Sequence, residues 1–367
     1  MTLRWPQALA WRMRQQLLDP VGTEPVAGVV RRLGAVVAQN EVRADLAVGM
    51  RSQLVAPGSV ARALAAGDLV KVYAFRGATH LMVPEDAGVY LALRAASRMW
   101  ELPSWRSYYE LEPSDWPALR EVVREALADG PLTRQTLATS VTARPRFAHL
   151  GPAFAGAADT LLKPLMWQGD MSFGPPKDGH ATFQRLDLNP RWAGIPELED
   201  AGPRAVTAYF STYGPATPEH VHYWLGEGLG AGRRRIASWI SGLGDALAPV
   251  GVDGHPLHVL RADLPDLLTT PASPVVRLLP GHDPWVLGPG TADPHVVPVG
   301  RRAVVSRGAN VLIASGVVSG TWTLKPDRVE TTWFAEAGPP PDDALDAEVG
   351  RLSTMLGRDL RPDVRTA

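Results

Sequence analysis

The chain has 367 residues, of which 45% are hydrophobic, and its 37 Lys and Arg side chains nearly balance 38 Asp and Glu. This composition is typical of a folded globular protein and excludes a disordered or collagen-like chain. The length favours about two to four domains. Because the sequence contains no cysteine, it excludes disulfides, a thiolate nucleophile and Cys-based metal sites.

The N-terminal residues MTLRWPQALAWRMRQQLLDP place arginines inside an apolar pattern, which predicts a folded helix rather than an export signal. No window of the sequence approaches about twenty apolar residues without a charge, so we expect no membrane span. A cytoplasmic protein fits both observations.

The charge is distributed unevenly along the chain. Residues 1–107 carry 13 basic and 8 acidic side chains, whereas the remainder carries 24 basic and 30 acidic ones. An anionic partner is therefore expected to bind mainly to the N-terminal part.

The N-terminal part predicts three helices followed by a hairpin. Thr23 and Pro25 are suited to open the first helix, whose apolar residues recur at helical spacing through Val37. Arg76-Gly77-Ala78 separates two β-rich runs. The second and third helices are expected at 42–54 and 59–67, and the strands at 69–75 and 79–83. Three helices closed by a hairpin are typical of a winged helix.

The same order is predicted twice more, which indicates an architectural repeat without sequence identity between copies. In the second copy, helices are expected at 116–128, 134–138 and 152–169, and strands at 171–174 and 180–186. In the third copy, helices are expected at 205–213, 218–226 and 233–243, and strands at 246–252 and 257–260.

The pattern changes after about residue 270 to short β-rich runs. These runs are VVRLLP, HVVPV, RAVV, ANVLIA, GVVSGTWTL and RVETTWF. They predict a small sheet or barrel, followed by a terminal amphipathic helix. The expected fold is α+β, with three tandem winged helices and a C-terminal β domain. The expected domain boundaries are 1–107, 108–195, 196–270 and 271–367.

Winged helices most often bind DNA, although many mediate only protein contacts. Arg233, Arg234 and Arg235 precede an apolar helix and are suited to phosphate contacts at its N-terminus, unless they only form a solvated helix start. The sequence has no Walker pattern and no Gly-x-Ser-x-Gly elbow. His220 and His222 lie two apart on an expected helix and point in different directions, so we expect no metal site.

Five motifs in a fixed order carry a family resemblance. They are LGAVVAQ at 33–39, FRGATHLMVPED at 75–86, YGPATPEHVHYW at 213–224, LLPGHDPWVLG at 278–288 and NVLIASGVVSGTW at 310–322. With these motifs the chain resembles the winged-helix DNA glycosylases of the AlkZ and YcaQ type, and it is closer to the AlkZ branch. The resemblance implies three winged helices forming a concave DNA-binding face, and hydrolysis of N-glycosidic bonds of alkylated purines, including N7-linked interstrand crosslinks.

The resemblance also implies a catalytic position. The AlkZ branch carries Gln-x-Gln at the end of the early helix, and the YcaQ branch carries Gln-x-Asp. Here Gln39 supplies the second member, while the first falls on Val37, which cannot hold water by a hydrogen bond. We expect Gln39 to position the water, with Asn40 as a further candidate. From the residues alone, Gln39-Asn40-Glu41 is a helix end with its capping residues.

The expected partner is double-stranded DNA carrying alkylated bases, bound in the nucleoid by a monomer that uses no metal and no cofactor. Trp285 and Trp322 are expected to pack in the core. Residues expected to contact DNA are Arg43, Arg51, Arg76, His80, Arg233, Arg234, Arg235, Asp283, Arg301 and Arg302.

The preferred function is a monofunctional glycosylase that excises bulky N7-alkylpurines, in general repair or in self-resistance to a DNA-alkylating natural product. Val37 motivates the alternative of a catalytically weak DNA-binding or adduct-sensing protein. A transcription regulator is the third possibility, and it requires a dimer that reads paired half-sites.

Overall fold

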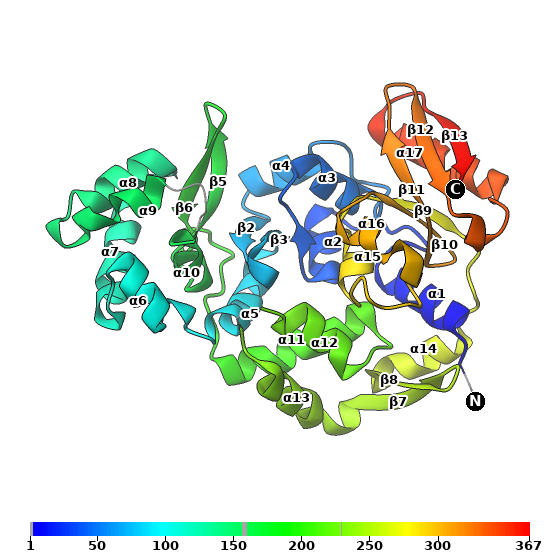
Figure 1. The fold of residues 1–367 in the computed structure, drawn as a ribbon, viewed down its shortest axis with the longest axis horizontal. Helices are drawn as coiled ribbons and strands as arrows, with labels where there is room; N and C mark the ends of the chain where they lie inside the picture. Colours follow the sequence, from blue (N-terminus) through cyan, green and yellow to red (C-terminus); the bar gives the residue numbers. More distant parts are fainter. Residues whose placement is uncertain (1–2, 156–159, 229) are drawn as a thin grey trace. The chain divides into compact units, whose positions relative to one another are not determined.

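The computed structural model describes residues 3–155, 160–228 and 230–367, and its fold is mixed α+β. The chain divides into two compact units (Figure 1). The first unit comprises residues 1–62, 206–224 and 237–367, and the second comprises 63–205 and 225–236. Each unit collects segments that are distant in sequence, and the four predicted domain boundaries stay a prediction.

A five-stranded sheet forms the C-terminal part of the first unit, in the order β13-β12-β11-β10-β9. Its strands are β9 (Val276–Leu279), β10 (Val311–Ala314), β11 (Val317–Leu324), β12 (Arg328–Trp333) and β13 (Arg361–Thr366). Neighbours are antiparallel except β12 and β13, which run parallel. Because β13 and β9 are its two edges, this sheet is open, and the barrel alternative is not found in the described residues.

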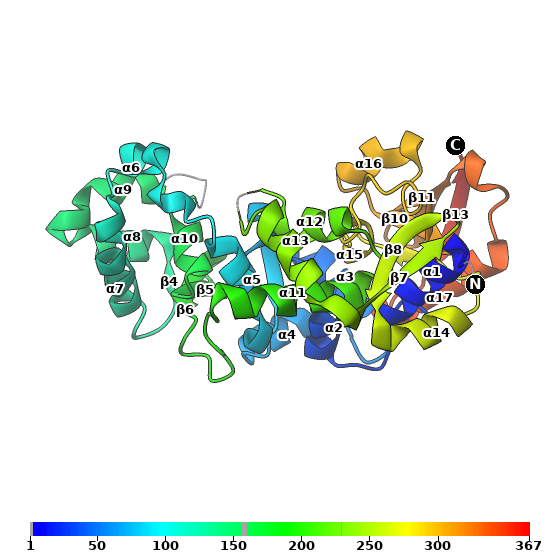
Figure 2. The ribbon, with the colours of Figure 1, turned by 90° about the horizontal axis from the view of Figure 1, so that it is seen from below.

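Two of the β-rich runs expected in this region are not strands. HVVPV forms turns, and RAVV lies in helix α16 (Arg302–Ser306), so these two predictions are wrong. Short apolar runs do not distinguish a strand from one helical turn. The predicted terminal helix is confirmed as α17 (Asp342–Leu356), which packs against β9 and β13. Figure 2 labels α17 and β13.

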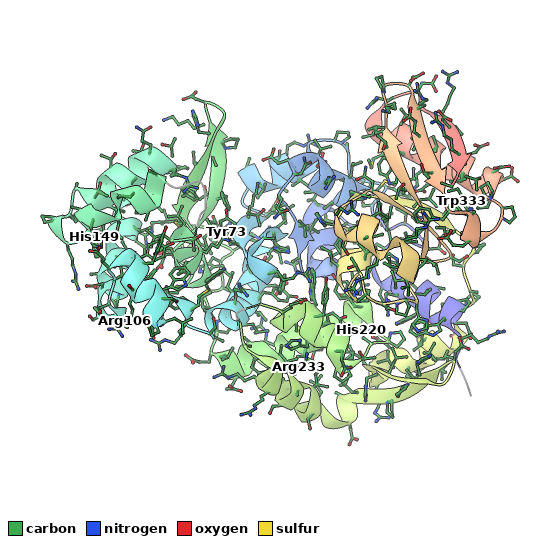
Figure 3. All side chains as sticks on the ribbon, in the orientation of Figure 1. Tyr73, Arg106, His149, His220, Arg233 and Trp333 are labelled. Atoms are coloured by element: carbon green, nitrogen blue, oxygen red, sulfur yellow. The ribbon has the colours of Figure 1, made fainter. Side chains whose placement is uncertain are left out.

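The core of this part links the sheet to helix α3 (Glu41–Gly49). Leu46 of α3 and Met50 after it are buried in one cluster with apolar residues of the sheet and of α17. Trp333, labelled in Figure 3, belongs to the same cluster and is 1% exposed. This packing fixes the helix that follows the predicted catalytic segment.

The rest of the first unit contains the N-terminal helices and a second hairpin. α1 (Trp5–Gln15) packs on β7 (Leu247–Val252), β8 (His255–Leu260) and α14 (Leu264–Thr269). α2 (Val26–Leu33) is followed by the short strand β1 (Val36–Val37). The expected helix through Val37 therefore ends earlier than predicted.

In the second unit, strands lie side by side in the order β3-β2-β5-β6-β4. They are β2 (Val70–Tyr73), β3 (Thr79–Met82), β4 (Leu132–Thr133), β5 (Met171–Lys177) and β6 (His180–Arg185). The helices of this unit are α5 (Pro84–Ala95), α6 (Pro103–Tyr109), α7 (Trp116–Ala126), α8 (Arg134–Thr142), α9 (Gly151–Ala155) and α10 (Leu162–Trp167). Thr133 caps α8 by accepting a hydrogen bond from the Thr136 amide, which is a usual role of threonine before a helix.

The predicted order of helices followed by a hairpin recurs three times within the described residues. The hairpins β2–β3, β5–β6 and β7–β8 are each antiparallel, as expected. The remaining helices of these successions are α4 (Ser59–Ala65), α11 (Leu198–Tyr213), α12 (Pro218–Gly226) and α13 (Arg233–Gly242). The helix expected at 152–169 is instead divided into α9 and α10, and its residues 156–159 lie outside the described part of the chain.

Among the residues that the structure describes, no helix is both long enough and apolar enough to cross a membrane.

Candidate active site

Gln39 follows a strand rather than ending a helix. Helix α2 ends because Gly34 adopts a φ of 75°, which glycine tolerates at a helix end. Val36 and Ala38 are then buried, whereas Val37 is half-buried and Gln39 is exposed. In extended backbone, alternate residues point to the same side. The side chains of Val37 and Gln39 therefore lie on the same side of the chain. In the helix that the sequence predicted, they would point in different directions.

The end of α2 is held by side chains from α11. The Tyr213 hydroxyl donates to the Leu33 carbonyl over 3.0 Å, and the Thr212 hydroxyl donates to the Arg32 carbonyl over 2.7 Å. The last carbonyls of a helix have no partner within the helix, so these bonds satisfy two of them. They also fix where the chain leaves α2 toward Gln39.

Asn40 caps the helix that follows. Its Oδ1 accepts a hydrogen bond from the Arg43 amide over 3.0 Å, which is the usual role of asparagine at this position. The oxygen that a catalytic role would use thus already serves the start of α3. This places Gln39 ahead of Asn40 as the candidate for holding a water.

The loop after strand β9 forms the facing wall. The Gly281 amide donates to Asn310 Oδ1 over 2.9 Å, and His282 adopts a φ of 62°. Asp283 then caps α15 (Pro284–Leu287) by accepting from the Trp285 amide over 2.8 Å. The loop is therefore anchored on both sides of His282.

Arg51 and Asp283 form a buried bidentate ion pair. Arg51 Nη2 lies 2.6 Å from Asp283 Oδ1, and Arg51 Nη1 lies 2.9 Å from Asp283 Oδ2. Their exposed fractions are 0% and 1%. Because their polar groups are directed at each other inside the protein, the structure favours a structural role for both residues over the expected DNA contact.

A cavity of about 150 Å³ opens between the β1–α3 segment and this loop. Its volume is well above the ~10–15 Å³ that one water requires. The residues that line it are Val36, Val37, Gln39, Asn40, Arg43, Ala47, Pro280, Gly281, His282, Asp283 and Pro284. The structure thus brings the predicted Gln39, Asn40, Arg43 and Asp283 together, in a cavity that can hold ordered water beside an amide, an imidazole and a guanidinium group.

His80 lies in strand β3 and is only 1% exposed. Its Nδ1 is 3.0 Å from the Ala78 carbonyl, and its ring meets Phe75 edge-on. Burial, aided by the Arg76 charge, lowers the pKa of His80 to about 4, although the Ala78 carbonyl opposes this shift. This burial favours a structural role for His80 over the expected DNA contact.

The other residues predicted to contact DNA differ in how exposed they are. Arg233, Arg234 and Arg235 are exposed at the start of α13, where Figure 3 labels Arg233, and Arg302 is exposed at the start of α16. Arg76 is half-exposed between β2 and β3. The DNA contacts of these five arginines stay predictions.

Arg301 is engaged within the protein. Its Nε and Nη2 lie 2.7 and 2.8 Å from the two Glu336 carboxylate oxygens, and its guanidinium lies over the Phe334 ring. Because the Arg301 guanidinium already binds a carboxylate, the structure favours a structural role for this residue over the expected phosphate contact.

The tryptophans of the motifs belong to the core, as expected. Trp285 and Trp322 are 0% and 3% exposed, and their indole nitrogens donate to the carbonyls of Gly316 and Leu279. Among the described residues, no group of three or more His, Asp or Glu side chains is arranged to hold a metal.

His282 is the residue of this cavity that the sequence interpretation missed. The motif LLPGHDPWVLG was noted for Asp283 and Trp285, although the histidine stands directly before the acid. A titratable residue between glycine and a helix-capping acid was the available signal.

Comparisons with known proteins identify the family of the chain. The family described as "DNA glycosylase AlkZ-like" matches residues 30–355. An interstrand DNA cross-link repair glycosylase of Streptomyces sahachiroi is 33% identical over 363 residues, covering 97% of this chain and 98% of that protein. The solved structure of Streptomyces sahachiroi DNA glycosylase AlkZ, 32% identical, covers 100% of both chains with a TM-score of 0.92. The chain therefore belongs to the AlkZ-like family of DNA glycosylases, which are hydrolases acting on N-glycosyl bonds.

Proposed function

We propose that the protein excises N7-alkylated purines from duplex DNA, including bulky adducts and interstrand crosslinks. The observation that carries the proposal is the position of Gln39 at a cavity with room for ordered water, on the same side of the chain as Val37. The Streptomyces sahachiroi relative is named for interstrand cross-link repair, which supports this substrate class.

The chemistry of the substrate suits a neutral catalytic amide. An N7-alkylated purine is cationic, so its departure from C1′ needs no strong general acid. The enzyme must mainly orient a water toward C1′ and stabilise positive charge on the sugar, and an amide oxygen can do both through its position and dipole. Gln39 is exposed at the cavity and is suited to this role.

Exposed arginines are suited to hold the DNA backbone. We assign phosphate contacts to Arg233, Arg234, Arg235, Arg302 and Arg76, and to Arg43 beside the cavity. The three successions of helices and hairpin are proposed to be winged helices, which place a helix in a groove and their remaining contacts on phosphates. A crosslinked base is too bulky to enter an enclosed pocket, so limited base flipping is expected.

The biological setting follows from the substrate. A protein that removes bulky N7 adducts serves in general alkylation repair or in self-resistance to a DNA-alkylating natural product. In either role we propose that the protein acts as a monomer on nucleoid DNA.

The first test uses a duplex oligonucleotide with a single N7-methylguanine. Alkali-labile abasic sites and released base are measured for the wild type and for Gln39→Ala. We expect release by the wild type and a loss on the order of 10 to 10³ in Gln39→Ala with DNA binding intact, since one preorganised polar group is removed. Unchanged release in Gln39→Ala contradicts the role of Gln39. Binding without any release by the wild type, on this adduct and on a bulkier N7 adduct, favours the adduct-sensing alternative that Val37 motivates.

A further inference from the structure

His282 shares the cavity with Gln39 and has no part in the mechanism described so far. We propose that His282 is a second catalytic residue, whose imidazole accepts a proton from the water that Gln39 orients. It would thereby supply the acceptor that the side chain of Val37 lacks. This inference rests on the proposed function, because it concerns the same hydrolysis.

The backbone at His282 is held in a conformation that histidine seldom adopts. Its φ of 62° lies in the left-handed region, which costs free energy for a residue with a Cβ. The conformation persists because Gly281 is bound to Asn310 on one side and Asp283 to Arg51 on the other. Strain that is enforced by anchored neighbours is a feature of functional sites.

The imidazole lies against the backbone of a glycine. A Cβ on Gly308 would lie 2.6 Å from His282 Cε1 and 2.8 Å from Nε2, so the ring packs directly on the Gly308 backbone. A Cβ on Gly281 would lie 2.0 Å from the Gly308 carbonyl oxygen. Gly281 and Gly308 therefore approach each other closely, and the imidazole lies against the Gly308 backbone.

The other polar side chains that line the cavity are unsuited to take a proton. Arg43 has only donors, and the Asn40 oxygen caps α3. The Asp283 carboxylate is buried and bonded to Arg51. Arg43 and Asp283 are also the charged residues among those that line the cavity with His282. His282 lines the cavity, and an imidazole nitrogen is chemically able to accept and hold a proton at ordinary pH.

The step balances in atoms and charge. The water oxygen bonds to C1′ as the C1′–N9 bond breaks, and the electron pair of that bond neutralises the cationic purine. One water proton passes to the imidazole and then to solvent. The products are a neutral alkylpurine, an abasic sugar with a new hydroxyl, and one proton.

The main test compares wild type with His282→Asn on the N7-methylguanine duplex. Asparagine tolerates the left-handed backbone but cannot hold the proton. We expect kcat to fall on the order of 10² with the Kd for DNA unchanged, as for loss of a general base. The wild-type rate should decrease toward acidic pH, and this decrease should be absent in the variant. His149→Asn, which changes an exposed histidine of the second unit labelled in Figure 3, is the matched control.

Two further variants separate catalysis from loop structure. His282→Gly removes the ring and the strain of the left-handed backbone. Imidazole added to the solution should raise the rate of base release by this variant at least about tenfold. Val37→Gln should raise the rate more in the His282→Asn background than in the wild type. In the wild type His282 already accepts the proton, whereas in His282→Asn a glutamine at position 37 would provide the missing acceptor.

Each outcome bears on the proposal. Wild-type release with an unchanged rate and pH profile in His282→Asn overturns the role of His282 alone. A large loss that neither imidazole nor Val37→Gln relieves also overturns it, because it indicates a purely structural role. Absence of release by the wild type overturns this inference together with the proposed function.

Discussion

Arg51 and Asp283 are joined by two hydrogen bonds of 2.6 and 2.9 Å in the interior of the first unit. Arg51 also donates to the Ala47 carbonyl over 2.7 Å, at the end of α3. One guanidinium therefore ties the helix that follows Gln39 to the loop that carries His282. The relation gives the acid of this motif a structural role beside the candidate site.

Breaking this pair should destabilise the protein strongly. Asp283→Asn keeps an oxygen for the Trp285 amide but leaves the buried Arg51 charge without a counterion. The cost of such a change is typically about 3–5 kcal/mol. We expect a matching decrease in the free energy of unfolding of the first unit, measured by urea denaturation, and a parallel loss of base release.

The control for this prediction is an exposed pair. Arg144 and Glu125 are 2.8 Å apart with side chains 58% and 52% exposed, so Glu125→Gln should change the unfolding midpoint little. Arg51→Met combined with Asp283→Asn should recover part of the lost stability, because no charge then stays buried. If the double variant lost as much free energy of unfolding as the two single variants together, this account would be contradicted.

Gly308 should be essential for activity through the ring of His282. Gly308→Ala places a Cβ where the imidazole now lies and must displace it. A displacement of about 1 Å at a catalytic group can reduce the rate on the order of 10². Single-turnover base release should fall accordingly, while DNA binding is retained.

The matched control for Gly308 is Gly338. Both glycines have a φ near 80°, so alanine strains the backbone at either position, but a Cβ on Gly338 meets nothing within 4 Å. Gly338→Ala should lose stability to a similar extent and keep its activity. Equal activity losses in the two variants would show that strain, rather than the ring, is responsible.

Local signals in the sequence were sufficient for the hairpins and for several helix ends. The turn at Arg76-Gly77-Ala78 joins β2 and β3, and Thr133 caps α8. These features depend on turn and capping residues, whose preferences are local. The pairing of β13 with β12 was not predicted, because it joins residues on either side of α17.

The candidate site was predicted in part. Gln39 came from a motif, and the structure adds that Gly34 ends α2 and turns the next residues into a strand. A glycine inside an apolar helical pattern was compatible with either outcome. The burial of Arg51 and His80 depends on tertiary partners that no sequence spacing indicates. The cavity joins the β1–α3 segment to a loop more than two hundred residues later, and for that reason His282 was missed.

Titration of His80 should make stability depend on pH. Burial lowers its pKa from 6.5 to about 4, so between these values the unfolded chain binds more protons than the folded one. Stability then rises with pH through this window and is lost as the pH falls from 6.5 toward 4, by about 3 kcal/mol in total. Urea unfolding at several pH values should show this dependence.

His80→Leu separates the contribution of His80 to the pH dependence of stability from the contributions of the other titratable groups. The variant keeps an apolar side chain against Phe75 but cannot titrate. Its stability relative to wild type should therefore improve as the pH falls from 6.5 to 4. A difference between the two proteins that is constant over this range would exclude His80 as a source of acid sensitivity.

The exposed arginines at the start of α13 should contribute to DNA affinity through counterion release. Arg233, Arg234 and Arg235 are exposed, and we assign them to phosphates. Each lost contact should reduce the slope of log K against log salt by about 0.9. Replacing all three with alanine should therefore lower the slope by up to about 2.7, as measured by fluorescence anisotropy on an unmodified duplex.

Arg361→Ala is the control for this series, because Arg361 is 76% exposed at its side chain and lies in β13 beside Asp327. The control should leave the salt slope unchanged. Single-turnover base release at saturating protein and low salt should also be unchanged in the triple variant, since the three arginines hold the backbone and do not contact the reacting atoms. A normal salt slope in the triple variant would remove α13 from the DNA interface. A reduced slope with an equally reduced rate at saturation would instead place these arginines where they orient the damaged nucleotide, because affinity alone does not limit a saturated reaction.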